Sequence, residues 1–186
     1  MKVVRIFVSD NSADGIWSIH FPHETQNEFD KFFDSMNNPE WVHDFFEKNN
    51  VELSNGFFGN ISIGEAVIIT LEEAQEMEYA LYQYAKQGFD DGYNKLQYFF
   101  KPLNNFEYII TLHQKSKLRI HKGWLRLYAI RLRENCYLVT GGAVKLTKDM
   151  KTEHLQTELK KLTQVIIFLR DNGIDYPEDL NTYKDE

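Results

Sequence analysis

The sequence of 186 residues has a single cysteine, Cys136, so no disulfide can form within the chain. Cys136 lies inside an apolar, strand-like stretch, which favours a buried thiol in a reducing compartment over a nucleophile. No window approaches the roughly twenty apolar residues that a membrane span needs. The first residues, MKVVRIFVSD, also have no apolar stretch of signal-peptide length. We therefore expect a cytoplasmic protein that does not contact a membrane.

The motifs of common cofactor and metal sites are also missing. His20 and His23 are three residues apart, but a proline lies between them, so surface histidines are expected rather than metal ligands. The pair Gly141-Gly142 lacks the remaining residues of a phosphate loop or a dinucleotide fingerprint. We therefore expect neither a metal nor a cofactor.

Positive charge is scarce in the first hundred residues and abundant afterwards. Residues 1–100 carry six Lys or Arg against seventeen Asp or Glu, whereas residues 115–161 carry twelve against four. The whole chain has a formal charge of −7. A local basic surface attracts phosphate groups, so this asymmetry indicates a polyanion as ligand. The alternative is that the acidic helices cover the protein's own basic sheet.

Composition and length predict one α+β domain over residues 1–186. An apolar fraction of 42% is far too high for a disordered chain. Residues 1–100 are expected to contain two strands followed by acidic helices, and residues 101–174 a basic antiparallel sheet with a closing helix. Residues 175–186 are expected to form a frayed acidic tail.

Local patterns in the amino-terminal part give approximate element boundaries. A turn at Asp14-Gly15 would join the first two strands. The spacings Thr25-x-x-Glu28 and Thr70-x-x-Glu73 are typical of helix capping boxes, with Ser62-x-x-Glu65 as an alternative start for the second of these helices. The expected elements are strands at Val3–Val8 and Ile16–Phe21, helices starting at about Thr25 and at Asn38-Pro39, and a helix from about Thr70 to Gln87 that stops at Gly88.

From Phe106 the apolar period changes to two, which predicts strands. Glu134-Asn135 is expected to form the turn of a hairpin, and Gly141-Gly142 a bulge or a site of close backbone approach. In the central strand, Leu125, Leu127 and Ala129 share one face. The expected elements are strands at Glu107–Leu112, Trp124–Arg133 and Tyr137–Lys145, and a last helix at about Thr152–Asn172.

Residues 101–170 resemble the RelE/HigB-like toxins of type II toxin–antitoxin systems. Many members show an aromatic-Arg-apolar-apolar-Tyr strand, a turn, an apolar strand and a Lys-rich segment in this order. In many relatives the arginine directly follows the aromatic residue, whereas Leu125 holds that place here. The matching elements are Lys101-Pro102-Leu103, the strand Gly123–Ile130, the turn Glu134-Asn135, the strand Tyr137–Thr140, and Val144–Lys148 before a closing helix.

The resemblance implies a RelE-like antiparallel sheet packed against helices, with RNA on the concave face of the sheet, and with residues 1–100 as a long amino-terminal helical elaboration. It also implies metal-independent cleavage of mRNA on the ribosome through the RNA's own 2′-hydroxyl, and a partner antitoxin of the helix-turn-helix type. The chemistry needs a proton acceptor, cations for the charged phosphorane and a donor to the leaving oxygen. The implied catalytic residues are Arg126, Tyr128, Lys145 and Lys148, and the implied RNA-binding residues are Lys115, Lys117, Arg119, His121, Lys122 and Trp124.

Each of these residues also has a structural alternative. The charged ones can be solvated strand residues, and Trp124 can be a core residue. On the same fold, the basic sheet could hold an acidic protein or a nucleic acid without cutting it. A non-catalytic binding protein is therefore the second hypothesis.

Overall fold

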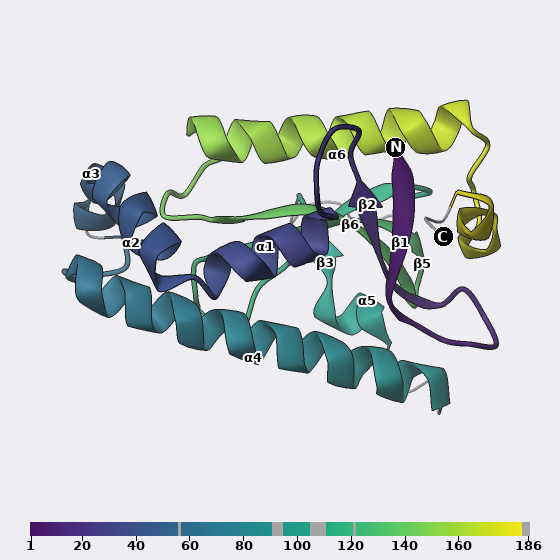
Figure 1. Cartoon of the computed structure of the whole chain (residues 1–186), viewed down its shortest axis with the longest axis horizontal. Coiled ribbons are helices and arrows are strands. Elements are labelled where there is room, and N and C mark those ends of the chain that lie inside the picture. Colours follow the sequence, from purple (N-terminus) through teal and green to yellow (C-terminus); the bar gives the residue numbers. More distant parts are fainter. Residues whose placement is uncertain (56, 91–94, 105–110, 121, 184–186) are drawn as a thin grey trace.

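The computed structural model describes residues 1–55, 57–90, 95–104, 111–120 and 122–183 as a mixed α+β fold. Its helices lie on both sides of one six-stranded sheet (Figure 1). The strands are β1 (Lys2–Val8), β2 (Gly15–His20), β3 (Lys101–Pro102), β4 (Gln114–Leu118), β5 (Leu125–Arg133) and β6 (Cys136–Val144). The helices are α1 (Glu28–Met36), α2 (Pro39–Lys48), α3 (Asn50–Ser54), α4 (Ile63–Asp90), α5 (Leu96–Phe99), α6 (Glu153–Asp171) and a 3-10 helix, η1 (Pro177–Thr182).

The sheet has the strand order β1-β2-β6-β5-β4-β3 and is mixed rather than antiparallel throughout. The hairpin β5–β6 and the pair β4–β5 are antiparallel, as expected, whereas β2 runs parallel to β6. The sequence did not predict this parallel pairing, because β2 and β6 are more than a hundred residues apart and local sequence patterns carry no information about which distant strands pair. Strands from the acidic first part and from the basic second part therefore belong to one sheet.

Three expected boundaries are corrected. Helix α1 is capped by the side chain of Asn27, not Thr25. Helix α4 starts at the alternative box, in which the Ser62 N–H donates to Glu65 Oε2 at 2.9 Å and the Glu65 N–H donates back to Ser62 Oγ at 3.3 Å. Thr70 is inside the helix, which continues past Gly88 to Asp90.

The strand expected at Glu107–Leu112 lies mostly outside the described residues, and Thr111 and Leu112 are not in a strand. The strand next to β5 is instead β4, in a segment for which no strand was expected. Residues 177–182 form η1 rather than a frayed tail, with Leu180 buried. The Val3 N–H donates to the carbonyl of Tyr183 at 2.9 Å, so the carboxyl-terminal segment lies beside β1.

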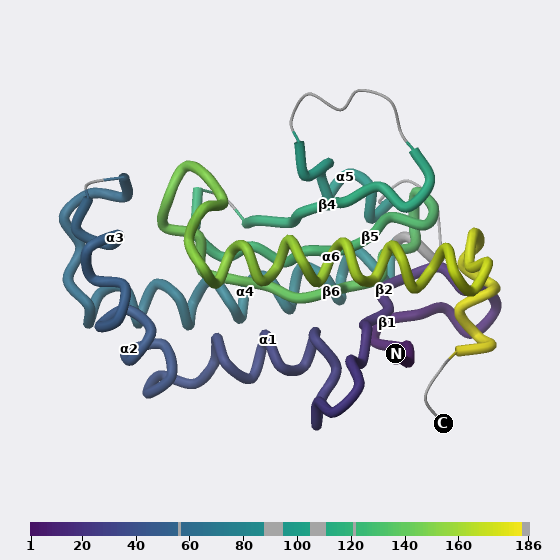
Figure 2. Tube along the Cα trace, turned by 90° about the horizontal axis from the view of Figure 1, so that it is seen from above, coloured from purple at the N-terminus to yellow at the C-terminus, as the bar shows by residue number. Residues whose placement is uncertain are grey.

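Alternating side chains of β5 enter two separate cores. Leu125, Leu127 and Ala129 pack with α1, α2 and α4, which confirms the facing expected from the sequence. Tyr128 and Ile130 pack on the opposite face beneath α6, which lies along the sheet in Figure 2. Helix α6 therefore covers the part of this sheet face that carries Tyr128 and Ile130. Among the described residues, no helix combines the length and the apolarity that a membrane crossing requires.

The glycine pair in β6 forms both a bulge and a close contact, as expected. Tyr128 pairs with Gly141 and Ala129 with Val139, so one residue of β6 is left over. A Cβ on Gly142 would lie 2.4 Å from the Phe32 ring of α1. The absence of a side chain there lets α1 pack directly on the strand.

We predict that Gly142→Ala lowers the free energy of unfolding by about 1–3 kcal/mol, because the buried Phe32 ring must move. Gly64→Ala is the matched control, since a Cβ at this helical position meets nothing within 4 Å. It should raise the unfolding free energy by up to about 1 kcal/mol. Chemical denaturation measures both changes. Equal stability of the two variants would contradict the packing of α1 on β6.

Candidate functional site

Three neighbouring segments bring four cations to one end of the sheet. Lys117 lies on β4 opposite Tyr128, and Arg119 follows the end of β4. Arg126 lies on β5 opposite Ala143. Lys145 follows β6, and its N–H donates to the carbonyl of Trp124 at 2.8 Å. We call Lys117, Arg119, Arg126 and Lys145 the basic cluster.

The positive charges of the basic cluster repel one another, which lowers the pKa values of three of its members. Burial, followed by the charge of Arg119, lowers the pKa of Arg126, which is only 7% exposed. Burial and the charges of Arg126 and Arg119 lower the pKa of Lys117. Burial and the charge of Arg126 also lower the pKa of Lys145. Like charges held together in this way favour a bound anion, and perturbed groups of this kind gather at functional sites.

Backbone carbonyls hold the cluster in place. Arg126 Nη1 donates to the carbonyls of Gly123 and Leu125 at 2.8 and 2.7 Å. Lys117 Nζ donates to the carbonyl of Leu103 at 2.8 Å, and Lys145 Nζ to those of Thr147 and Lys148. These carbonyl acceptors are neutral and orient the cations, while the nearby carboxylates of Glu73 and Asp149 act on Arg126 and Lys145. The cluster can therefore attract a phosphate group.

Two residues implied to be catalytic are next to the cluster but have other contacts. Tyr128 is 1% exposed beneath α6, and burial raises the pKa of its hydroxyl, which donates to Met150 Sδ at 3.5 Å. A buried phenol that holds its proton so firmly is unsuited to proton transfer at neutral pH. The Lys148 ammonium lies 5.9 Å from the centre of the Phe57 ring, a contact with the segment after α3.

Of the implied RNA-binding residues, Lys117 and Arg119 belong to the basic cluster, whereas the others are dispersed. Trp124 is a core residue that donates from Nε1 to Thr70 Oγ1 at 2.9 Å and packs edge-on against Phe46 and Phe58. It cannot stack on a base while the core is closed. Lys115 donates to Thr163 Oγ1 of α6 at 3.0 Å, and Lys122 is exposed. His121 lies outside the described residues.

Glu73 is a site-positioning residue that the sequence analysis assigned to helix capping. It reaches from the middle of α4 to the start of β5, where its carboxylate accepts from the N–H groups of Trp124 and Leu125 at 3.2 and 3.0 Å. Burial raises the pKa of Glu73 to about 7, although these two N–H groups and the charge of Arg126 oppose the shift. Only the fold shows this contact, because fifty residues separate the partners.

We expect the raised pKa of Glu73 to make stability depend on pH. Between pH 4.5 and about 7 the folded protein holds a proton that the unfolded chain releases, so the unfolding free energy falls as pH rises. This fall is at most about 1.4 kcal/mol per pH unit, or roughly 3 kcal/mol in all. Denaturation across this range should give a flatter dependence for Glu73→Gln. Identical slopes in both proteins would contradict a protonated Glu73.

Within the described residues, one group of three side chains could hold a metal ion. His43, Asp44 and Glu47 lie exposed on α2 with their ligand atoms within 4.8 Å of one another. Exposed acidic groups of this kind are common without an ion, so we assign no metal to them.

Comparison of the chain with family models, with curated proteins and with solved structures finds no match. The functional assignment therefore depends on the geometry of the basic cluster and on the resemblance of residues 101–170.

Proposed function

We propose that this protein is a toxin of the RelE/HigB type, a metal-independent endoribonuclease that cleaves translated mRNA and is neutralised by an antitoxin of the helix-turn-helix type. The order of elements supports the proposal. Trp124 directly precedes β5, which carries Arg126 and Tyr128, and a tight turn, the apolar strand β6, a Lys-rich segment and the closing helix α6 follow in this order. These elements occur in the order that the resemblance implies.

The observation that carries the proposal is the convergence of the four cations of the basic cluster. Arg126 and Arg119 would bind the nonbridging oxygens of the scissile phosphate and stabilise the phosphorane. Lys117 and Lys145 have lowered pKa values. A lysine whose pKa is lowered toward neutrality is better suited to donate and accept protons in a reaction. The catalytic set therefore changes to Lys117, Arg119, Arg126 and Lys145, and Tyr128 becomes a packing residue.

The proposed reaction needs only the RNA and these side chains. The 2′-oxygen would attack the adjacent phosphorus, and one lysine of the cluster, in its unprotonated form, would accept the proton. The bond from phosphorus to the 5′-oxygen breaks, and the leaving oxygen takes a proton from a protonated lysine. The products are a 2′,3′-cyclic phosphate and a 5′-hydroxyl.

Expression of the protein alone in a bacterial host tests the proposal. We expect growth to stop within a few generations because translated mRNA is cut, and co-expression of the protein encoded by the neighbouring gene to restore growth. Undiminished growth with abundant, folded protein would contradict the toxin assignment.

A non-catalytic binding protein is the second candidate, and two observations favour it. The Arg126 guanidinium already donates to two carbonyls of its own chain, and Tyr128 is buried. In this case, the cluster would bind RNA or an acidic protein and leave it intact. Binding of single-stranded RNA that weakens with salt, without any cleavage of translated mRNA, would identify this second function.

A further inference from the structure

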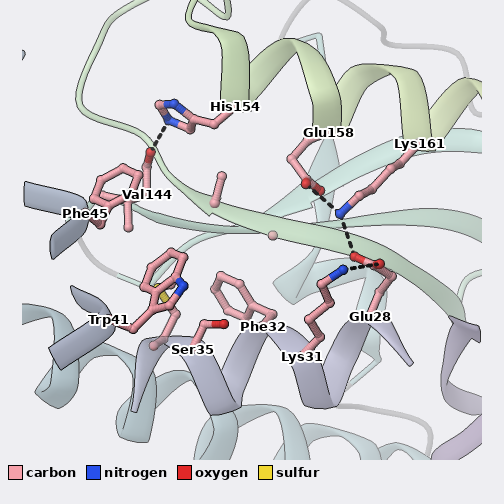
Figure 3. A pocket seen from close by; sticks show the side chains of 13 residues that line it. Glu28, Lys31, Phe32, Ser35, Trp41, Phe45, Val144, His154, Glu158 and Lys161 are labelled. Atoms are coloured by element: carbon pink, nitrogen blue, oxygen red, sulfur yellow. Dashed lines mark hydrogen bonds and ion pairs between the residues drawn. The ribbon is translucent and has the colours of Figure 1, made fainter. Parts of the chain in front are cut away.

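A cavity of about 240 Å³ lies at the open edge of β6, between α1 and α6 (Figure 3). The pairing of β2 with β6 ends at Ser18 and Val139, so the last part of β6 extends beyond its parallel neighbour. Gly142, Ala143 and Val144 of this extension form one wall of the cavity. The cavity is separate from the basic cluster, because none of the four cations lines it.

The cavity is apolar at one end, where aromatic rings from two helices gather (Figure 3). Phe32 comes from α1, and Trp41 and Phe45 come from α2. Trp41 is 42% exposed although it stacks on Phe45, with the ring centres 5.7 Å apart. Aromatic faces attract cations as well as apolar groups.

Buried carboxylates form the other end of the cavity. Glu28 and Glu158 are 3% and 5% exposed, and Lys161 Nζ donates to Glu28 Oε2 at 2.6 Å and to Glu158 Oε1 at 2.8 Å. The remaining oxygens, Glu28 Oε1 and Glu158 Oε2, are buried and accept no hydrogen bond. Glu158 Oε2 lies against Gly141, next to the lining residue Gly142. A buried acceptor without a donor lowers stability, so two such oxygens on residues that line the cavity favour a ligand with N–H donors.

The charges around the carboxylates also favour a cation. Lys31 Nζ lies 3.8 Å from Glu28 Oε1 but only 2.9 Å from Glu24 Oε2, so its closer ion pair is with a third carboxylate, Glu24. Three carboxylates (Glu24, Glu28 and Glu158) therefore face two lysines (Lys31 and Lys161), and the group lacks one positive charge when all are ionised.

We propose that this cavity is a binding site for a small organic cation, an ammonium or guanidinium group on an aromatic or aliphatic body. The cationic head would lie near Glu28 and Glu158 and the body against Phe32, Trp41 and Phe45. A cavity of 240 Å³ has the volume of about eight water molecules, which suits a body of roughly eight to ten heavy atoms.

Burial raises the pKa of Glu158 to about 7. Near neutral pH, a proton on Glu158 therefore neutralises part of the negative charge that a bound cation would otherwise neutralise. The groups that act on Glu158 are Lys161 of its own helix, Glu28 and Lys31 of α1, and Tyr128 of β5. A bound cation favours the ionised carboxylate, so binding releases a proton and tightens as pH rises through 7.

Calorimetric titration of the full chain with phenethylamine tests the proposal, with 2-phenylethanol and 3-phenylpropionate as neutral and anionic probes of similar shape. We expect saturable binding of the amine, at least about tenfold tighter than either other probe, and tighter at about pH 8 than at about pH 6. Equal affinity for the amine and the alcohol, or no binding of the amine, would overturn the proposal.

Two variants locate the binding. Glu158→Gln should weaken binding of phenethylamine by about tenfold or more and remove its pH dependence. Glu153→Gln is the matched control, because Glu153 is exposed on the same helix and does not line the cavity. Since Glu158 is buried, Trp41→Ala provides a second variant at an exposed position, and it should also weaken binding. Unchanged affinity in both Glu158→Gln and Trp41→Ala would place the amine elsewhere and refute the site.

Discussion

The double variant Lys117→Gln/Lys145→Gln is expected to cleave translated mRNA at least about a hundredfold more slowly than the wild type, because one transition-state donor alone is worth about that much. The reason lies in the basic cluster. These two lysines have lowered pKa values and act electrostatically with Arg126, and in the proposed reaction they carry both proton transfers and part of the phosphorane's stabilisation. The measurement is the cleavage rate of a reporter mRNA in a translating extract.

The same double variant should fold as well as the wild type. Each lysine repels Arg126, and removing that repulsion offsets the loss of hydrogen bonds to backbone carbonyls. We expect the unfolding free energy to change by no more than about 1 kcal/mol. The control is Lys151→Gln/Lys160→Gln, which removes the same charge from exposed positions. Equal loss of cleavage in the control would show that net charge, not the cluster, matters.

The variant Leu127→Asp is expected not to fold. Leu127 has no exposed surface and lies in the centre of β5, within the core shared with α1, α2 and α4. An aspartate there loses the packing of leucine and buries an unpaired carboxylate, which costs on the order of 4 kcal/mol or more. Since a domain is stable by only about 5–15 kcal/mol, this loss removes most or all of the folded population.

Ile167→Asp is the control for this variant, because Ile167 is 52% exposed on α6. It should change the unfolding free energy by only about 0.5 kcal/mol. Circular dichroism and thermal melting report both variants. A normal cooperative melt of Leu127→Asp would mean that the facing of β5 is wrong, and with it the position of Arg126.

Local periodicity was enough to predict the hairpin and its two faces. The turn at Glu134-Asn135 and the alternation of Leu125, Leu127 and Ala129 follow from the pleat of a strand, which depends only on neighbouring residues. The same rule placed Arg126 and Tyr128 on one face. It could not show that α6 covers Tyr128, because the alternating sequence pattern of a strand does not reveal whether its second face contacts solvent or a helix.

Contacts between distant segments could not be predicted. The parallel pairing of β2 with β6 and the reach of Glu73 from α4 to β5 have no local sequence signal. Glu73 matched a capping box because the spacing Thr70-x-x-Glu73 also occurs inside helices. One feature of the sequence indicated the position of Glu158. The pair Gly141-Gly142 predicted that another group comes close to the backbone, and the group that lies against Gly141 is the Glu158 carboxylate. Nothing local predicted that Glu28 lies nearby.

The central claim is that the basic cluster cuts RNA through the RNA's own 2′-hydroxyl. Its most direct test is the analysis of the new ends in a reporter mRNA translated with the purified wild-type protein. We predict cuts within the translated region, with 2′,3′-cyclic phosphates upstream and 5′-hydroxyls downstream of each cut. An mRNA that stays intact beside folded protein, or products with 5′-phosphates, would contradict the account.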